Sequence, residues 1–575
     1  MAAILIAAAT IGVYWNTLGN EFLTFDDRKY IYENTLVTGN GGLQAIWGDV
    51  TNDKPRLHYY PMTFTTFWIE YSLVGLEPPD ADPARTVSKR AHPLYHWTQM
   101  SLHAINAGLV LFALYFLGVR YMASVFTAAF FALHPVNVAS VAWMAERKSL
   151  VSGLFLWLTL LLYCFYRRRS AAVPANARGK VRWFYGATIL GFTLALCSKA
   201  ASLVLAPVLI VTDRVLDRRW SWASVFRCAP FFLLGLIMAG ITSAREAHIA
   251  KSWEPIDVWL RPFIAVSSLV HYVGKMLLPV KQAIIYPRWA ESLLEPRYWI
   301  SLAIFVAAAI LIRRYREWLG DHWLWGLALY LLTVAPVLGL KHFIWTQFAF
   351  VSDHYMYYGS PGILLMIGLL LERWCREKDP SPGDGRAATS TSLKQSRVVV
   401  VGVLSVLGLA ACGWRTVQQN RTWHDNAALW THTLTVSSDC FLANMNLGNH
   451  YSREGNDQRA LELYRECTRI RPDFAHTWRS SARKAGRLGL VDEAIGRFKN
   501  AVAAAEAKNP WAWSIQVEYA DYLSSLGRLE EALVEYETVL QKEPPEASKI
   551  KAKADRVRLR VRNSTPPETP TAPRE

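Results

Sequence analysis

Two adjacent carboxylates, Asp26 and Asp27, stand just beyond an apolar N-terminal segment and are followed by Arg28, Lys29 and Tyr30. Neighbouring carboxylates repel each other, so a cation or a metal ion beside them would stabilise the pair. A carboxylate in this position can act as a general base on a hydroxyl group. The alternative is a helix N-cap or a solvated turn, which adjacent aspartates also make. The residues alone leave both interpretations open.

Successive side chains of an extended loop point in opposite directions. We therefore expect only one of these two aspartates to reach a given atom. The other would orient the loop, a metal ion or an acceptor.

Three further groups of polar residues each lie directly against an apolar segment. Their members are His134, Glu146, Arg147 and Lys148 in the first, Lys199 in the second, and Asp353, His354 and Tyr357 in the third. We expect these turns to converge on one side of the chain's apolar part, where a lipid-linked phosphate would arrive. The alternative is that the charged groups are anchors that reach toward the membrane surface.

Within these groups the expected roles differ. Cations attract phosphate, and carboxylates more readily orient those cations or an acceptor than contact the anion. The phosphate-binding candidates are Arg147, Lys148, Lys199 and His354, and the supporting candidates are Glu146, Asp353, Tyr357 and His134.

Long apolar segments adjoin all of these residues. The chain has 575 residues, of which 52% are hydrophobic. A helix that crosses a bilayer needs about 20 apolar residues. Residues 261–280 carry His271 and Lys275 and are interpreted as an interfacial or re-entrant helix on the outer side. Eleven segments are interpreted as spans, at 2–17, 94–119, 122–133, 149–166, 183–198, 201–212, 228–243, 299–312, 321–340, 356–372 and 397–414. The sequence therefore predicts an all-α fold with a polytopic membrane domain over residues 1–415.

The distribution of Lys and Arg predicts the orientation of that domain. A cytoplasmic N-terminus places 20 of them in loops inside the cell, whereas the large outer loop at 18–92 carries seven. Because cytoplasmic loops are enriched in Lys and Arg, we expect a multi-pass protein of the inner or plasma membrane with a cytoplasmic N-terminus. Residues 373–396 then form a cytoplasmic linker. The net charge of +16 is explained by this pattern, and no nucleic-acid-binding module is present in the sequence.

After the last span, three segments repeat with a period near 34 residues, starting at Phe441, Ala475 and Trp513. Small residues recur at one offset, as Ala460, Ala494 and Ala532, and aromatic residues recur at another, as Tyr464, Phe498 and Tyr536. This pattern is typical of tetratricopeptide repeats, in which two helices per repeat pack closely. The sequence predicts a connecting half-repeat at 416–440, a three-repeat α-solenoid at 441–545 on the outer or periplasmic side, and a basic, then Pro- and Thr-rich tail at 546–575.

The motifs together resemble one known family, the transmembrane and tetratricopeptide-repeat O-mannosyltransferases. The resemblance rests on Phe25-Asp26-Asp27 with Asn34, on the segments 133–137, 145–148, 352–357 and 421–425, and on the repeats that follow. It covers nearly the whole chain, and its specific part is the order of the motifs within this combined architecture. A bacterial member of the family is expected from the short repeat array.

The resemblance implies a GT-C glycosyltransferase, a polytopic enzyme with an acidic motif in its first outer loop and a polyprenyl-phosphate sugar as donor. It implies an inverting transfer of mannose to Ser or Thr of a protein or peptide, which the repeats bind. It favours Asp26 as the base, with Asp27 orienting the loop, a metal ion or the acceptor. A divalent cation, Mg or Mn, is left open, and no metal ligands are assigned.

Two departures from the family stand out. The animal members have longer repeat arrays, and His354 stands where many relatives carry Arg, which makes phosphate binding there dependent on protonation. Two other functions stay open: a GT-C enzyme that acts on a glycan or lipid acceptor, and a non-catalytic membrane scaffold for envelope assembly.

Overall fold

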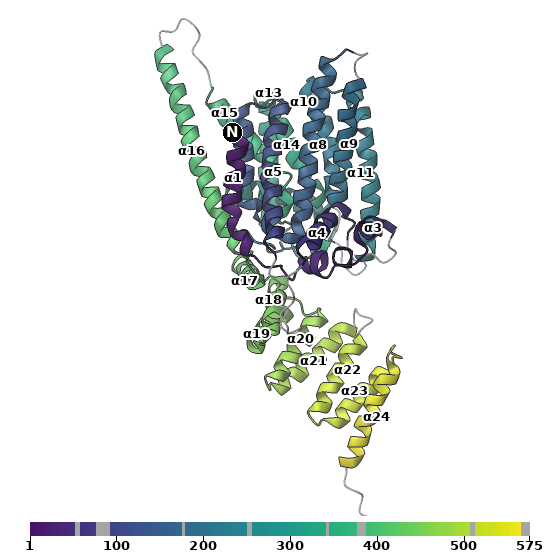
Figure 1. Cartoon of the computed structure of the whole chain (residues 1–575). Coiled ribbons are helices and arrows are strands. Elements are labelled where there is room, and N and C mark those ends of the chain that lie inside the picture. Colours follow the sequence, from purple (N-terminus) through teal and green to yellow (C-terminus); the bar gives the residue numbers. More distant parts are fainter. Residues whose placement is uncertain are drawn as a thin grey trace, which may run out of the picture. The chain divides into compact units, whose positions relative to one another are not determined.

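The computed structural model describes residues 1–51, 58–75, 92–174, 179–249, 256–340, 344–376, 387–506 and 512–564. Parts of four expected features lie outside these ranges, namely parts of the outer loop at 18–92, of the linker at 373–396, of the repeat array at 441–545 and of the tail at 546–575. The described residues form helices and no β-strand. The chain divides into two compact units, Met1–Ser437 and Ser438–Glu575 (Figure 1).

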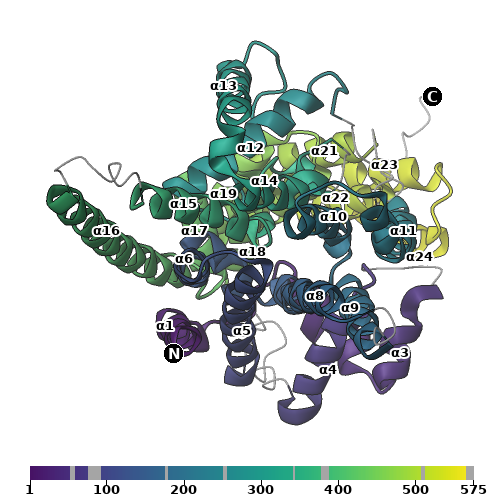
Figure 2. The ribbon, with the colours of Figure 1, turned by 90° about the horizontal axis from the view of Figure 1, so that it is seen from above.

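Most of each apolar segment interpreted as a span is helical in the first unit. Figure 1 shows α1, α5, α8, α9 and α11 standing side by side, and in Figure 2 α13 and α16 lie at different edges of the unit. The helices are α1 (Ala2–Tyr14), α5 (Pro93–Leu117), α6 (Tyr121–Leu133), α8 (Arg147–Ala172), α9 (Gly179–Ser198), α10 (Leu205–Asp217), α11 (Trp222–Ile249), α13 (Pro296–Leu319), α14 (Asp321–Val334), α15 (Ser360–Trp374) and α16 (Ala387–Arg421).

Helix length supports fewer crossings than the eleven expected. Among the described residues, seven helices are long and apolar enough to cross a membrane. An eighth is added if α6 and the segment Pro135–Ala142, bent by 51° at the break between them, count as one span. Helices α10, α14 and α15 have 13, 14 and 15 residues. At 1.5 Å per residue, each covers roughly 20 Å of a hydrocarbon core about 30 Å thick.

Helix α12 (Arg261–Leu277) corresponds to the segment interpreted as interfacial or re-entrant. It is not among the seven helices that can cross a membrane. One of its faces is buried through Ile264, Tyr272 and Met276, and it packs against α13.

Short helices occupy the described part of the outer loop. They are η1 (Trp15–Gly19), η2 (Arg28–Tyr32), α2 (Thr35–Thr38), α3 (Gly42–Gly48), η3 (Asp49–Thr51) and α4 (Pro61–Val74). Asn34 caps α2, because its side-chain oxygen accepts from the backbone N–H of Leu36 at 3.0 Å. The aspartate pair stands between η1 and η2, so short helical turns hold it on both sides.

The first unit extends further than the sequence predicted. Helix α16 continues to Arg421, and α17 (Asn426–Val436) belongs to the same compact unit. Thr24 donates from its backbone N–H and from its hydroxyl to Asn426 Oδ1, both at 2.9 Å. Most of the segment assigned to a connecting half-repeat therefore packs against the outer loop of the first unit.

The second unit consists of consecutive helices that pack in pairs. They are α18 (Phe441–Arg453), α19 (Asp457–Ile470), α20 (Ala475–Arg487), α21 (Val491–Glu506), α22 (Ala512–Ser525), α23 (Leu529–Leu540) and α24 (Ala547–Ser564). The repeating alanines Ala460, Ala494 and Ala532 are fully buried. A Cβ on Gly448 would come within 2.9 Å of the Tyr464 ring, so the first pair requires a glycine there.

Helix α24 was not predicted from the sequence, which indicated only a basic tail. Its Ile550, Ala554 and Val557 are buried in one core cluster with Tyr536 and Val539 of α23. These three residues recur at helical spacing, so they form one apolar face. Helix α24 therefore covers the apolar side of the last helix pair.

We expect Ile550→Ala to destabilise the second unit, expressed as residues 438–564, by about 2–5 kcal/mol, because it leaves a cavity in a packed core. Leu559→Ala on the same helix is the matched control. Leu559 is 59% exposed, and an exposed substitution changes stability by no more than about 0.5 kcal/mol. Urea denaturation followed by circular dichroism measures both. Equal stability of the two variants would contradict the assignment of α24 as part of the folded core.

Candidate active site

The two aspartates lie in a helical turn. The backbone N–H groups of Lys29 and Tyr30 both donate to Asp26 O at 3.0 Å, and Asp27 has helical backbone angles, φ −59° and ψ −32°. The expectation of an extended loop was wrong. The two carboxylates nevertheless occupy different surroundings, since neighbouring residues of a helix are rotated by about 100°.

The Asp27 carboxylate is engaged in holding two segments together. It accepts from the backbone N–H of Leu23 at 2.8 Å and from that of Ala145 at 2.7 Å, and it is almost completely buried. Burial raises the pKa of Asp27 to about 7, although the two N–H donors act in the opposite direction. This aspartate fastens the outer loop to the turn that precedes α8.

The Asp26 carboxylate does not accept backbone hydrogen bonds of the kind that hold Asp27, as far as the described residues show. It is partly exposed, and within the described residues its side chain has no hydrogen-bond or ion-pair partner. Burial raises its pKa above the ordinary value, the Lys148 ammonium lowers it, and Glu146 raises it again. Asp26 is thus a carboxylate of increased basicity whose oxygens can receive a proton.

Glu146 joins the two lysines beside this carboxylate. Its Oε1 lies 2.7 Å from Lys148 Nζ, and its Oε2 lies 3.3 Å from Lys199 Nζ. The hydroxyl of Ser149 donates to Glu146 Oε2 and accepts from Lys199 Nζ at 2.8 Å. Glu146, Lys148 and Lys199, with Ser149, form what we call the lysine–glutamate cluster, as expected for these three candidates.

Both ammonium groups of the lysine–glutamate cluster are largely withdrawn from water. The side chains of Lys148 and Lys199 are 10% and 13% exposed. Lys148 Nζ lies 4.8 Å from the centroid of the Tyr30 ring and 5.5 Å from that of Trp143, distances at which a cation is attracted to an aromatic face. Burial lowers the pKa of Lys199.

His354 reaches the lysine–glutamate cluster but does not supply a charge. Its Nε2 lies 3.8 Å from Glu146 Oε1, and its Nδ1 lies 2.8 Å from Ser352 Oγ. Burial lowers the pKa of His354 to about 3, so the ring is neutral near pH 7. The expected role of His354 as a phosphate-binding cation is corrected to that of a neutral side chain beside Glu146.

Arg147 points away from the lysine–glutamate cluster and is fully buried. Its guanidinium pairs with Glu70, donates to Gln99 Oε1 at 3.2 Å and to Tyr95 O at 2.7 Å, and lies 4.3 Å from the centroid of the Phe67 ring. All of these partners are on α4 and α5. The expectation that Arg147 binds a donor phosphate is therefore wrong, and its contacts instead join α4, α5 and α8.

Three other candidates also lie outside the cluster. Asp353 accepts from the Tyr286 hydroxyl at 2.8 Å, on the side that faces Lys275 rather than Glu146. His134 Nε2 lies 3.1 Å from Met276 O, in the buried turn after α6. The Tyr357 hydroxyl accepts from Asn106 at 2.9 Å and lies 3.0 Å from His103 Nδ1, between α5 and α8. Each of these side chains makes buried contacts that hold helices together.

Aromatic residues frame the site, and two of them, Trp143 and Trp430, were not candidates from the sequence. The Phe25 ring stacks on Trp143 with centroids 5.8 Å apart and meets Trp430 of α17 edge-on at 5.5 Å. Trp143 also lies 6.0 Å from Trp423. The motifs at 25–27 and 421–425 are thus joined through aromatic contacts next to Lys148.

Two of the overlooked residues had a signal in the sequence. Tyr30 stands four residues after Asp26, and Ser149 stands three residues after Glu146. These spacings place side chains on one face once the backbone is helical. Glu70 had no such signal, because its partner Arg147 is far away in the chain.

A metal site is not defined by side chains of the described part of the chain, where no three His, Cys, Asp or Glu residues gather. The carboxylates near the site are Asp26, Asp27 and Glu146, and the last two already have partners. Asp26 alone has free oxygens to offer a cation.

Comparison with known proteins gives relatives of one kind. The chain is 22% identical to human Protein O-mannosyl-transferase TMTC4 over 519 aligned positions, and the alignment covers 80% of this chain and 65% of that protein. It is 20% identical to human Protein O-mannosyl-transferase TMTC3, covering 85% of this chain and 53% of that protein. The corresponding values for Protein O-mannosyl-transferase F38B6.6 of Caenorhabditis elegans are 19%, 82% and 63%. The resemblance inferred from the motifs is confirmed by these relatives.

The chain spans less than two thirds of the length of each of these relatives. No family model matches it. Among solved structures, an Archaeoglobus fulgidus oligosaccharyltransferase tethered to an acceptor peptide aligns with 72% of this chain and 55% of its own, with 11% identity and a TM-score of 0.37.

Proposed function

We propose that this protein is a membrane glycosyltransferase that transfers mannose from a polyprenyl-phosphate donor to Ser or Thr hydroxyls of proteins. The observation that carries the proposal is a partly exposed carboxylate without partners, Asp26, beside the lysine–glutamate cluster at one end of a polytopic helical unit. The curated relatives, all named protein O-mannosyl-transferases, support the choice of sugar and of a protein acceptor.

Asp26 is the general base of the proposed transfer. The acceptor oxygen attacks the anomeric carbon of the sugar from the face opposite the phosphate, and its proton passes to the Asp26 carboxylate. The bond between the anomeric carbon and the phosphate oxygen breaks, so the configuration at that carbon is inverted and the lipid phosphate leaves with the bonding electrons. A base with a raised pKa takes the proton more readily than an ordinary aspartate.

Lys148 and Lys199 stabilise the departing phosphate. The donor is a phosphodiester with one negative charge, and the released lipid phosphate gains a second as Asp26 is neutralised. Negative charge therefore moves from the base to the phosphate during the reaction. Ammonium groups held in place before the reaction stabilise such a developing charge most effectively, because they need no rearrangement. Glu146 holds both in place through its two oxygens.

The helix pairs of the second unit are the proposed binding region for the acceptor or a partner protein. Stacked helix pairs present an extended surface to a peptide. In this unit Glu518 pairs with Arg479 at 2.5 Å and also with Arg483, so charged side chains link α20 and α22. The acceptor is then engaged by the repeats and modified at Asp26.

The proposed orientation places Asp26 on the outer side of the inner or plasma membrane. Helix α8 begins at the lysine–glutamate cluster and ends beyond Arg167, which pairs with Asp213 near the end of α10. Arg214 pairs with Asp321 at the start of α14, and Arg373 of α15 stacks on Trp318 near the end of α13. The Arg-rich ends of α8, α10, α13 and α15 therefore lie together, away from the lysine–glutamate cluster, and such ends face the cytoplasm. Helix α16 ends at the Asp26 side, where His424 O accepts from the Glu21 N–H at 2.8 Å. The chain therefore leaves the first unit on the outer side.

In a background from which the seven native cysteines have been removed, a single cysteine introduced by Ser548→Cys, at an exposed position of α24, should be labelled by an impermeant maleimide. Intact cells serve for the assay, or spheroplasts where an outer membrane blocks access. The control is Arg314→Cys, an exposed position near the C-terminal end of α13, at the end of the first unit that lies away from Asp26. This cysteine should be labelled only after the cells are permeabilised. The reverse pattern would show that the orientation is inverted.

The transfer itself is tested with a polyprenyl-phosphate mannose and a Ser/Thr peptide in liposomes. Asp26→Asn should lower kcat by about 10² to 10⁴ with unchanged thermal stability, because it removes only the proton acceptor. Asp27→Asn should lower stability by about 1–3 kcal/mol, because the amide cannot accept both backbone bonds as the carboxylate does. Glu33→Gln is the control, since this half-exposed acid pairs, within the described part of the loop, with Arg28 at the surface.

Mass spectrometry of the product decides among the remaining functions. Mannose on the peptide hydroxyl supports the proposal, whereas transfer to a glycan or lipid alone would point to another GT-C reaction. If Asp26→Asn turns over as fast as the folded wild-type protein, the carboxylate is not the base. A protein that binds its partners but transfers nothing is a scaffold.

A further inference from the structure

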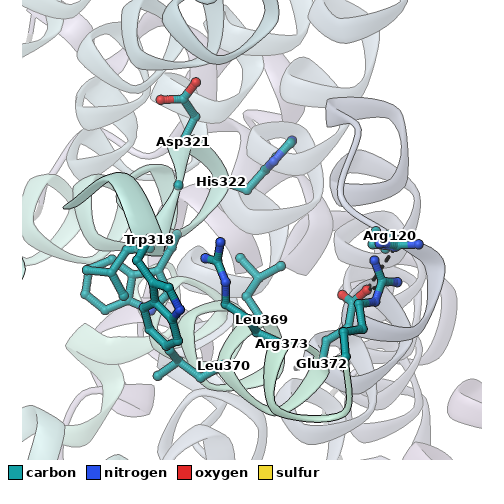
Figure 3. Close-up of a pocket in the computed structure, with 12 residues that line it drawn as sticks. Arg120, Trp318, Asp321, His322, Leu369, Leu370, Glu372 and Arg373 are labelled. Atoms are coloured by element: carbon teal, nitrogen blue, oxygen red, sulfur yellow. Dashed lines mark ion pairs between the residues drawn. The ribbon is translucent and has the colours of Figure 1, made fainter. Parts of the chain in front are cut away.

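A second charged hollow lies at the end of the first unit opposite Asp26. It has a volume of about 380 Å³ and is lined by the adjoining ends of α13, α14 and α15 and by the residue that precedes α6. The polar and aromatic lining residues used below are Arg120, Trp318, Asp321, His322, Glu372 and Arg373. Figure 3 shows Arg373 between Trp318 and Glu372, with His322 on the far side of its guanidinium.

The acidic residues of this hollow are already paired. Glu372 Oε1 lies 2.9 Å from Arg120 and 2.5 Å from Arg376. Asp321 Oδ2 lies 3.2 Å from Arg214, which is outside the lining. Both ion pairs of Glu372 use Oε1, and its Oε2 is buried without a hydrogen-bond partner in the described part of the chain. The lining holds three arginines, Arg120, Arg373 and Arg376, against the two carboxylates of Asp321 and Glu372, so the hollow keeps an excess of positive charge.

Arg373 is the arginine of this group with unused donors. Its guanidinium lies 4.7 Å from the centroid of the Trp318 ring, and among the described residues its side chain has neither a carboxylate nor a hydrogen-bond partner. A guanidinium that stacks on an aromatic ring keeps its edge N–H groups free. Such a fork matches two oxygens of a phosphate group.

His322 adds a buried ring nitrogen without a well-formed hydrogen bond. Its Nε2 is enclosed and has no hydrogen-bond partner in good geometry among the described residues, although the ring interacts with the backbone of Leu117. It lies 3.4 Å from the position of a Cβ on Gly118, and Arg168 Nη2 lies 3.6 Å from the same point. A polar atom buried without a partner is costly, so a ligand that supplies one would be stabilised there.

We propose that this hollow binds the phosphate group of an anionic phospholipid headgroup. The ligand chemistry is a phosphate ester that Arg373 holds at two oxygens, with Arg120 and His322 as neighbours. A lipid is favoured over soluble phosphate because Leu319, Leu369 and Leu370 also line the hollow. In the apolar stretch of α13, the helix beside the hollow, only 11% of the residues are buried, so acyl chains can lie along this helix. Basic hollows between membrane helices are suited to such headgroups.

The test measures equilibrium binding of dioctanoyl phosphatidylglycerol to the full chain in detergent, by isothermal titration calorimetry. Dioctanoyl phosphatidylcholine, which has the same phosphate but no net charge, should bind at least tenfold more weakly. Arg373→Ala and, separately, His322→Ala should each weaken phosphatidylglycerol binding about tenfold. The matched control is Arg313→Ala, which removes an exposed charge at the same end of α13 and should leave the affinity within twofold.

Inorganic phosphate distinguishes the two sources of the anion. The lipid assignment requires phosphate to bind at least tenfold more weakly than phosphatidylglycerol, and equal affinity would overturn it in favour of a soluble phosphate. Equal binding of the two lipids, or equal losses in Arg373→Ala and Arg313→Ala, would overturn the proposed hollow. Thermal unfolding of each variant shows whether it is folded. If Arg373→Ala does not fold, the loss of phosphatidylglycerol binding in His322→Ala tests the proposal instead.

Discussion

The ammonium groups of Lys148 and Lys199 lie largely out of water around a single carboxylate, that of Glu146. Withdrawing an ion from water costs several kcal/mol unless an opposite charge and hydrogen bonds compensate for it. One carboxylate between two ammonium groups leaves a positive charge uncompensated, and Asp26 is the nearby anion with free oxygens. The proposed reaction neutralises Asp26 at the moment when the leaving phosphate gains its second charge. The total charge of the site therefore stays constant, while one negative charge moves from Asp26 to the leaving phosphate.

This charge balance depends on how the outer loop is fastened. Asp27 binds the loop to the turn before α8 through the N–H of Ala145, and that turn leads directly into Glu146. Phe25, in contact with Trp143 and Trp430, fixes the other side of the same loop. Arg147 ties the start of α8 to α4 through Glu70. Asp26 and Asp27 are neighbours, and so are Arg147 and Lys148. Neighbouring residues of a helix are rotated by about 100°, so in each pair one side chain faces the site and the other contacts the surrounding helices.

The sequence allowed some of this arrangement to be predicted, and physical reasons limit the rest. Apolar segment length and the alanines at fixed offsets predicted the helices, because both report burial directly. The gathering of Glu146, Lys148 and Lys199 was also predicted. The different directions of Arg147 and Lys148 were not predicted, because they depend on where α8 begins and on Glu70, whose contact is long-range. His354 was expected to be a cation, since its burial among aromatic rings cannot be read from neighbouring residues. The apolar face of α24 could have been predicted from the spacing of Ile550, Ala554 and Val557.

The proposed base makes the pH dependence of the transfer rate the most direct measurement. Asp26 must be ionised to take the acceptor proton, and burial raises its pKa. The wild-type kcat/KM should therefore fall about tenfold per pH unit on the acidic side, with a midpoint above the value of about 3.9 for a free aspartate. The residual activity of Asp26→Asn should lack this acidic limb, whereas Glu33→Gln should keep it. An acidic limb with the same midpoint in Asp26→Asn would show that another group is the base and would contradict the account.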